Sequence, residues 1–195
     1  MKIWLIRHGA TAATEAHLYC GSTDIPLSEK GREALALRRP CIGEEVKYIT
    51  SGMRRCTETL RLLFGDVPFE TDPAFREIDF GAFEMKSYEE LKNDPAYLAW
   101  ITGDNEANIP PRGESGRQMR GRVLAGMEAL LSAGEDAVVV THGGVIAAVM
   151  AELFPAEGKS RYAWQPAPGG GYELTAEGGT IAARPLTFRE DICIM

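Results

Sequence analysis

The chain has 195 residues, of which 45% are hydrophobic and 25% are charged. This length suits one domain with a core of its own, and the composition excludes a disordered, collagen-like or coiled-coil chain. The formal net charge of −7 opposes binding to nucleic acid or to an anionic membrane, so an anionic small substrate needs a local basic pocket. No segment approaches the ~20 apolar residues of a membrane span, and the N-terminal apolar run is too short for a signal peptide.

The cysteines give no sign of a disulfide framework or of a metal site. No two of the four are spaced as CxxC, which excludes a zinc ribbon and a thioredoxin-type motif: they are Cys20, Cys41, Cys56 and Cys193. Reduced thiols are typical of a reducing compartment, and we therefore expect a cytoplasmic protein.

Strands and helices are predicted to alternate in the first half of the chain. The apolar run that begins at Ile3 predicts a buried strand, because it is short and is followed by glycine. Ser28 and Ser51 are expected to cap the two helices that follow, and Pro40 ends the first of them. In chain order, we expect a strand at Ile3–Ile6, a long loop over 9–27 and a helix over 28–40. A strand at Val46–Thr50 and a helix over 51–64 are expected to follow.

The second half continues the alternation. Weak alternation over 75–80 indicates a short strand, and the aliphatic run Ala137–Val140 is the strongest signal of a parallel sheet. Further along, we expect a helix over 86–101, a loop over 102–114 and a helix from Ser115 onward. The last elements are expected to be a helix over Val145–Phe154 and a hairpin of Tyr172–Leu174 with Thr180–Ala183. We see no internal repeat and no linker, so the pattern predicts one α/β domain over 1–195. Its architecture is a three-layer sandwich, in which helices cover both faces of a mostly parallel central sheet.

Two of the three histidines follow predicted buried strands. His8 and His142 each stand at a strand end and precede a glycine. The carboxyl ends of parallel strands form the ligand crevice of such sheets, so the two histidines are expected to meet in one pocket. A single histidine at a strand end is more often structural, but Arg7 beside His8 favours a functional site, because a charge that ends a buried strand is costly unless it is paired or liganded.

Basic side chains near these histidines indicate a phosphate pocket. Arg54 and Arg55 lie in the first turn of the helix over 51–64, where guanidinium groups and free backbone N–H groups both favour phosphate oxygens. The alternative is that both arginines are solvated surface residues. The glycines at 169–171 follow no strand and lack the Lys-Ser/Thr of a Walker motif, so they are expected to form an ordinary loop.

Phosphoryl transfer also needs an acid for the leaving group. It requires a nucleophile in line, positive charge on the equatorial oxygens, and a proton donor. A neutral histidine is a good nucleophile. The segment 75–84 offers three carboxyls among aromatic residues, Glu77, Asp79 and Glu84, and apolar neighbours raise the pKa of a carboxyl. These residues by themselves do not choose among the three.

Six motifs resemble the histidine phosphatase superfamily, also called phosphoglycerate mutase-like. They stand in the order of that family and span the chain to about residue 150: Leu5–Thr11, Asp24–Gly31, Thr50–Arg55, Arg76–Gly81, Gly113–Ser115 and Val140–Gly144. The resemblance implies the phosphoglycerate mutase-like fold and a metal-independent reaction without a cofactor. A metal site built from the three histidines is the weakest interpretation, because His17 lies in a loop without a carboxylate at ligand spacing.

The resemblance also implies site residues. His8 matches the nucleophile that becomes phosphohistidine, and Glu77 matches the general acid that later activates water. Arg55 is preferred to Arg54, because the family arginine stands four residues after its motif serine, here Ser51. The implied catalytic set is Arg7, His8, Arg55, Glu77 and His142. The implied substrate-binding set is Arg7, Thr14, Gly21, Arg55, His142 and Gly143.

Four departures from the family pattern leave these catalytic groups in place. Ala10 replaces a usual polar residue, and Thr14 stands where many members have asparagine, although its hydroxyl can still donate. Gly52-Met53 replaces Pro-Leu at the start of a helix, and Met85 replaces a glycine. We therefore expect an active enzyme with altered contacts around Thr14 and Met85.

Chain length and two motifs resemble the short phosphatase branch. Phe80–Glu84 and Gly113–Ser115 are most similar to α-ribazole-phosphate phosphatases of cobalamin biosynthesis. The alternatives are a broad-specificity sugar or nucleotide phosphatase, a phosphoglycerate mutase, and a non-catalytic phospho-ligand binding module. A helical cap is expected at about 86–114, where Tyr88, Tyr97 and Trp100 either stack on an aromatic leaving group or pack a helix core. The expected partner is a small phosphorylated metabolite, with no nucleic acid and no membrane, and the oligomeric state stays open.

Overall fold

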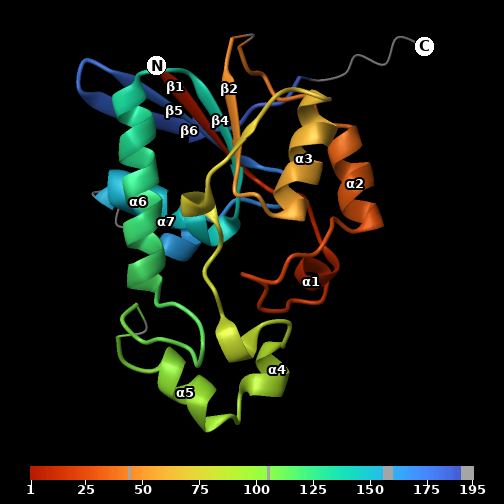
Figure 1. Ribbon diagram of the computed structural model, residues 1–195, viewed down its shortest axis with the longest axis vertical. Helices are drawn as coiled ribbons and strands as arrows, with labels where there is room; N and C mark the ends of the chain where they lie inside the picture. Colours follow the sequence, from red (N-terminus) through yellow and green to blue (C-terminus); the bar gives the residue numbers. More distant parts are fainter. Residues whose placement is uncertain (44, 105, 156–159, 190–195) are drawn as a thin grey trace.

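The computed structural model describes residues 1–43, 45–104, 106–155 and 160–189. At its centre lies a six-stranded sheet in the order β3-β2-β4-β1-β5-β6 (Figure 1). The four strands at one side of this order run parallel, and β5 and β6 are antiparallel additions. The strands are β1 Lys2–Arg7, β2 Lys47–Thr50, β3 Glu70–Thr71, β4 Ala137–Thr141, β5 Gly171–Glu177 and β6 Thr180–Pro185.

Helices cover both faces of this sheet. In Figure 1, α2 and α3 lie on one side of the strands and α6 and α7 on the other. This arrangement confirms the predicted three-layer α/β sandwich. The helices are α1 Ala12–Glu15, α2 Glu29–Ala36, α3 Arg54–Phe64, α4 Tyr88–Leu91, α5 Pro95–Ile101, α6 Gly116–Ala133 and α7 Gly143–Leu153, with short 3-10 turns η1 Pro73–Phe75, η2 Gly81–Phe83 and η4 Arg161–Trp164.

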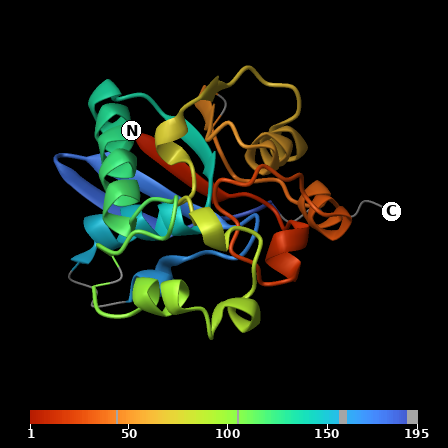
Figure 2. The same ribbon diagram turned by 60° about the horizontal axis from the view of Figure 1, so that its bottom comes forward.

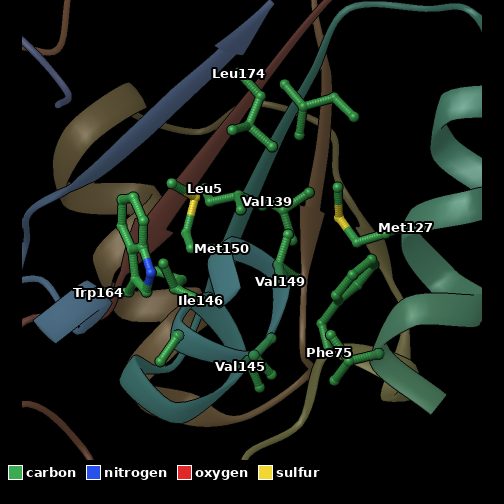
Figure 3. Close-up of a cluster of buried hydrophobic side chains, with 14 of the residues drawn as sticks. Leu5, Phe75, Met127, Val139, Val145, Ile146, Val149, Met150, Trp164 and Leu174 are labelled. Atoms are coloured by element: carbon green, nitrogen blue, oxygen red, sulfur yellow. The ribbon is translucent and has the colours of Figure 1, made fainter. Parts of the chain in front are cut away.

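The central strands divide the hydrophobic core into two clusters. Successive side chains of a strand point to opposite faces, so Leu5 and Val139 belong to the cluster under α6 and α7. Ile6 and Val140 belong to the cluster under α2 and α3. Figure 3 shows the first cluster, where the sheet residues meet apolar side chains of α7. Because β1 and β4 are buried on both faces, their carboxyl ends are held firmly.

The first predicted helix is shorter than expected. The sequence predicts that Pro40 ends it, but α2 ends at Ala36, with Leu37 as its C-cap.

Four further details of the predicted elements are wrong. Residues 76–80 form neither helix nor strand, since their carbonyl groups bind a side chain of α6 instead of a neighbouring strand. The helix expected over 86–101 is two helices, because Pro95 cannot stand inside a helix and begins α5 under the cap of Asp94. Ser51 does not cap α3: Met53 holds that position without a side-chain hydrogen bond. The long loop at 9–27 contains α1, which Thr11 caps.

Other expectations agree with the structure. The predicted strand over Ala137–Val140 lies within β4, and the predicted hairpin is formed by β5 and β6. Ser115 caps α6 in a reciprocal arrangement with Gln118, which satisfies backbone donors that a helix start would otherwise leave free. The sequence missed the two-residue strand β3 at the sheet edge.

The helices α4 and α5 lie beyond the carboxyl ends of the parallel strands. Figure 1 shows them at the foot of the view, and Figure 2 brings this end of the molecule forward. Tyr97 packs in a small cluster with Phe83 and Leu91, which makes it a core residue of this segment. Tyr88 is 55% exposed, and Trp100 is half-buried at the edge of the cluster. No helix among the described residues is long and apolar enough to cross a membrane.

Candidate active site

His8 and His142 meet because their strands are parallel neighbours. Arg7 of β1 pairs with Thr141 of β4, and the N–H of His8 donates to the carbonyl of Thr141 over 2.9 Å. His8 follows Arg7 and His142 follows Thr141, so the two histidines lie at the same edge of the sheet. The two imidazole rings lie edge to face with their centroids 5.2 Å apart.

The surroundings of His8 keep its imidazole neutral. Burial lowers the pKa of His8 to about 3, and the positive charges of Arg55 and Arg7 add to this effect against the opposing hydrogen bond to Gly9. The Nδ1 atom lies 2.7 Å from the carbonyl oxygen of Gly9, so it carries the proton and donates. The Nε2 atom then keeps its lone pair, which is the state that a nucleophile requires.

A cavity of about 350 Å³ lies at this edge of the sheet. Six of the residues that the sequence assigned to the site line it: Arg7, His8, Thr14, Arg55, Glu77 and Gly143. Gly21 and His142 do not line it. The cavity also contains residues that the sequence did not select, among them His17 and Cys20.

Arg55 is almost fully buried at the base of this cavity, at 1% exposure. Its guanidinium donates to the carbonyl oxygens of Gly21 at 2.7 Å and Thr23 at 2.8 Å, and its Nε donates to Nδ1 of His142 at 3.3 Å. The cation is thus held by neutral acceptors and keeps a net positive charge beside His8. Arg54 is solvent-exposed and lies 3.6 Å from Glu58, so the two neighbouring arginines have different surroundings.

Arg7 offers an unused donor. One of its terminal nitrogens donates to the carbonyl of Pro166 at 2.7 Å, while its Nε is buried and without a partner among the described residues. Burial lowers the pKa of Arg7, and the nearby carboxylate of Glu77 raises it. Buried donors are almost always satisfied, so an unpaired Nε beside a basic cavity is suited to an oxygen of an anionic ligand.

His142 stands behind Arg55. It is fully buried, and its Nε2 lies 2.9 Å from the hydroxyl of Ser51. Because Nδ1 accepts from Arg55, Nε2 carries the proton and donates to Ser51. Burial, followed by the charge of Arg55, lowers the pKa of His142 well below its ordinary value. Its contact with phosphate stays a prediction, as does that of Gly21, whose N–H is bound to Glu84.

The structure distinguishes the three candidate carboxyls. Glu77 reaches the cavity, where its two oxygens accept from the N–H groups of Gly144 at 2.9 Å and Ile78 at 3.0 Å. Asp79 accepts from the Ser22 hydroxyl and from a backbone N–H group. Glu84 accepts from four backbone N–H groups and one hydroxyl, which ties the loop of Gly21 to the segment that follows Glu77. Of the three, only Glu77 lines the cavity with His8.

A second cavity of about 300 Å³ adjoins the first. Its walls include three aromatic residues in mutual contact, Tyr19, Phe80 and Trp100, with ring centroids 5.1–6.0 Å apart. Glu77 lines both cavities, and Gly144 in the second follows Gly143 in the first. We call this second cavity the aromatic cleft. Phe80 belongs to the motif Arg76–Gly81 and Tyr19 lies between two motifs, but no local pattern places them in one wall.

The described residues contain no group of three His, Cys, Asp or Glu side chains that could hold a metal ion. Three of the four ring nitrogens of His8 and His142 form hydrogen bonds, to Gly9, Arg55 and Ser51, and Nε2 of His8 is the fourth. His17 lies at the rim of the basic cavity with a φ of 53°, a backbone conformation that is uncommon outside glycine.

Comparison with known proteins agrees with this geometry. The histidine phosphatase superfamily (branch 1) matches residues 3–186. An adenosylcobalamin/α-ribazole phosphatase from Salmonella typhimurium is 33% identical over 163 residues, which cover 78% of this chain and 79% of that protein. The crystal structure of the α-ribazole phosphatase from Shigella flexneri has a TM-score of 0.83 at 27% identity, covering 95% of this chain and 96% of that one. That of phosphoglycerate mutase from Thermus thermophilus has a TM-score of 0.73 at 29% identity, covering 96% and 99%.

The fold, together with His8 and two arginines that line one basic cavity, defines a phosphoryl-transfer enzyme of the phosphoglycerate mutase-like class. The chain belongs to the histidine phosphatase superfamily and is a phosphatase. The resemblance drawn from its six motifs is therefore confirmed.

Proposed function

We propose that this phosphatase hydrolyses a phosphomonoester whose leaving group carries an aromatic ring, and that α-ribazole 5′-phosphate is its substrate. The observation that carries the proposal is that two cavities of different chemistry share Glu77. The basic cavity has the charge for a phosphate, and the aromatic cleft has faces on which a flat ring can stack. The relatives named α-ribazole phosphatases support the same substrate class.

In the first step, the phosphoryl group moves to His8. Arg7 and Arg55 bind the phosphate oxygens, with the N–H of Gly143 at the start of α7 as a further donor and Thr14 at the rim. The lone pair of Nε2 of His8 attacks phosphorus, and the bond from phosphorus to the ester oxygen breaks. Glu77 gives its proton to that oxygen, so an alcohol leaves and phosphohistidine remains.

In the second step, water takes the phosphoryl group from His8. Glu77 is now a carboxylate, and it removes a proton from the water that attacks phosphorus. The bond from phosphorus to Nε2 breaks, which restores neutral His8, protonated Glu77 and inorganic phosphate. His142 acts beside these steps by accepting from Arg55 and so orienting its guanidinium.

The aromatic cleft also separates the phosphatase from a mutase. A phosphoglycerate carries a carboxylate beside its phosphate, and that second anion needs a cation. Among the described residues, no lysine or arginine lines the aromatic cleft. Transfer to water, without a second anionic substrate held in place, therefore suits this site better than transfer between hydroxyl groups.

The proposal places the whole activity in one domain over 1–195, with the segment at about 86–114 as its cap. The partner is a small phosphorylated metabolite, because the net charge of −7 disfavours nucleic acid and anionic membranes. A cytoplasmic location stays a prediction from the cysteines. Of these, Cys20, Cys41 and Cys56 are free thiols, and Cys193 lies outside the described residues.

A panel of esters tests this function. We expect kcat/KM to be highest for α-ribazole 5′-phosphate, lower for ribose 5-phosphate, and lowest for 3-phosphoglycerate. Trp100→Ala should reduce the preference for α-ribazole phosphate over ribose phosphate by about tenfold, since aromatic pairs contribute about 0.5–1.5 kcal/mol. Tyr88→Ala is the matched control, because this exposed ring does not line the cleft. A preference for 3-phosphoglycerate, or equal effects of the two variants, would contradict the proposal.

A further inference from the structure

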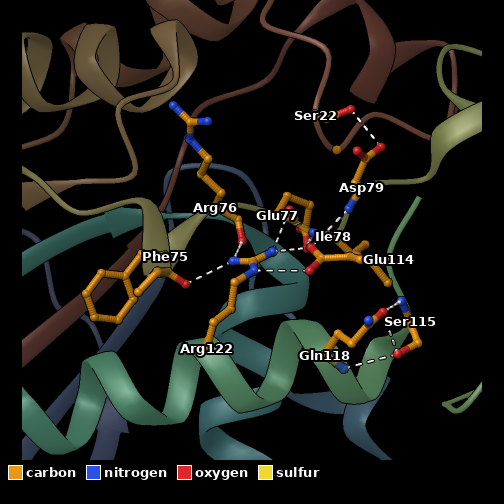
Figure 4. A network of polar contacts seen from close by, with 12 residues as sticks. Ser22, Phe75, Arg76, Glu77, Ile78, Asp79, Glu114, Ser115, Gln118 and Arg122 are labelled. Atoms are coloured by element: carbon orange, nitrogen blue, oxygen red, sulfur yellow. Dashed lines mark hydrogen bonds and ion pairs between the residues drawn. The ribbon is translucent and has the colours of Figure 1, made fainter. Parts of the chain in front are cut away.

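We propose that Arg122 of α6, assisted by Glu114, is a positioning residue that sets the place of the general acid Glu77. Figure 4 shows the guanidinium of Arg122 between the carboxylate of Glu114 and the backbone of 74–77. The inference rests on the proposed function, because it assigns a second residue to the acid step. Neither Arg122 nor Glu114 lines the basic cavity or the aromatic cleft.

Arg122 uses all of its donors in this arrangement. Its three nitrogens carry five N–H groups, and five hydrogen bonds are formed. Three of them go to the carbonyl oxygens of Ala74 at 2.9 Å, Arg76 at 2.6 Å and Glu77 at 3.0 Å. The other two form a fork on the carboxylate of Glu114. A lysine at this position has three donors from one atom and cannot reproduce the pattern.

Glu114 extends the same contacts along the chain. One of its carboxylate oxygens accepts from the N–H of Asp79 at 3.2 Å, and its own N–H donates to the carbonyl of Asp79 at 3.0 Å. Arg122 and Glu114 together therefore bind the backbone on both sides of Glu77.

The segment needs such contacts because it has no regular structure. Residues 76–80 belong to no helix or strand, so no ladder of backbone hydrogen bonds places them. Unpaired carbonyl groups in a partly buried segment are costly, and side chains of α6 satisfy them instead. In this partly buried pair, Arg122 belongs to the long helix α6 and Glu114 directly precedes Ser115, the residue that caps it.

This backbone position decides where the acid group lies. The Glu77 residue is held at its carbonyl by Arg122 and at its carboxylate by the N–H of Gly144. A general acid must lie within about 2.6–3.2 Å of the oxygen that it protonates. A displacement of about 1 Å can cost on the order of 100-fold in rate. Loosening 74–79 therefore slows the step that uses the Glu77 proton and spares steps that do not.

The test compares two leaving groups in single-turnover reactions of Arg122→Lys. The variant keeps the positive charge and loses the fork. We expect transfer from ribose 5-phosphate to slow by about 10–100-fold, because its alkoxide needs a proton. Transfer from p-nitrophenyl phosphate should slow by less than about threefold, because nitrophenolate leaves without one. Arg120→Lys is the matched control on the same helix, since Arg120 is half-exposed and its ion pair with Glu152 is long, at 3.9 Å.

A double variant separates positioning from general damage. Once Glu77→Gln has removed the proton, adding Arg122→Lys should cause no further loss with ribose 5-phosphate. Equal losses on both esters, or additive losses in the double variant, would overturn the inference. Glu114→Gln, which weakens the fork and keeps its shape, should give a smaller loss of the same kind, and it serves if Arg122→Lys does not fold.

Glu77→Gln alone distinguishes a failure of the positioning role of Arg122 from a failure of the acid role of Glu77. If Glu77→Gln shows the leaving-group dependence and Arg122→Lys does not, only the positioning role is overturned. A Glu77→Gln enzyme without that dependence overturns the acid assignment in the proposed function, and the positioning role with it.

Discussion

Gly144 and Glu77 are in contact through a hydrogen bond that leaves no room for a side chain. The N–H of Gly144 donates to the carboxylate of Glu77 over 2.9 Å. A Cβ atom added at Gly144 would stand 2.4 Å from the other carboxylate oxygen. The second glycine after His142 therefore allows the helix start to approach the acid group closely.

Gly144→Ala is expected to displace this carboxylate without unfolding the protein. The atom in the way is the end of a flexible side chain, so the fold can adjust at low cost. We expect a loss of about 10–100-fold in kcat with ribose 5-phosphate, within the range that general acid catalysis supplies. Urea unfolding should show a stability close to that of the unchanged protein. Unchanged turnover would mean that Glu77 does not need this position.

His8→Ala is expected to abolish turnover. In the proposed function this imidazole is the covalent nucleophile, and the loss of such a group costs several orders of magnitude in rate. During turnover of the unchanged enzyme, phosphate that is labile to acid and stable to base should be trapped on His8. Phosphate found on another residue, or substantial turnover by the alanine variant, would reject this nucleophile.

Substitution of Arg55 and Arg54 should give very different results. Arg55→Ala removes the hydrogen bonds to the carbonyl groups of Gly21 and Thr23 and the cation beside His8, and hydrogen bonds to charged groups contribute roughly 1.5–3 kcal/mol each. We expect losses of stability, of rate and of affinity for vanadate. Arg54→Ala removes one exposed ion pair, which contributes less than about 1 kcal/mol. Vanadate inhibition and urea unfolding check both variants, and equal effects would refute the assignment.

Glu77→Gln should slow ribosyl esters far more than nitrophenyl phosphate, by about 10²–10⁴-fold in the first turnover. The first turnover is the right measurement, because in the proposed function later turnovers include hydrolysis of phosphohistidine with the same carboxyl as base. Asp79→Asn and Glu84→Gln are controls from the same acidic segment, since their oxygens are occupied by the loop at Ser22. If one of these controls shows the leaving-group dependence and Glu77→Gln does not, the control residue is the general acid and Glu77 is not.

The stability of the protein should fall as the pH falls below about 6.5, before the carboxylates titrate. The pKa of His8 is about 3 in the folded protein and near its ordinary value of 6.5 when unfolded. Between these values the unfolded state binds one more proton, so the free energy of unfolding rises with pH by roughly 1.4 kcal/mol per unit. His142, with its lowered pKa, adds in the same direction.

Urea unfolding between pH 4.5 and 7.5 measures this slope, and His8→Ala should reduce it. The pKa of Glu58 is lowered from its ordinary value, so its contribution to stability is lost at lower pH than that of the histidines. The same slope in the unchanged protein and in His8→Ala would show that His8 is not buried in its neutral form.

Several features of this protein follow from the sequence alone. The buried strands β1 and β4, the cap at Ser28, the helix that begins at Ser115, and the histidines at the strand ends are all predicted correctly, because apolar runs and helix-start residues act over a few neighbouring positions. The parallel sheet then brings His8 and His142 together without further information.

Only the tertiary structure decides how residues 74–80 are arranged and what they face. Their alternation resembles a strand, yet their carbonyl groups bind Arg122, which lies more than forty positions further along the chain. The structure also shows that the loop at Gly21 and Ser22 donates to Glu84 and Asp79, whereas Glu77 lines the basic cavity. The aromatic cleft likewise joins Tyr19, Phe80 and Trp100 from separate segments. Such side-chain contacts between distant segments leave no period and no fixed spacing, so the chain must fold before they exist.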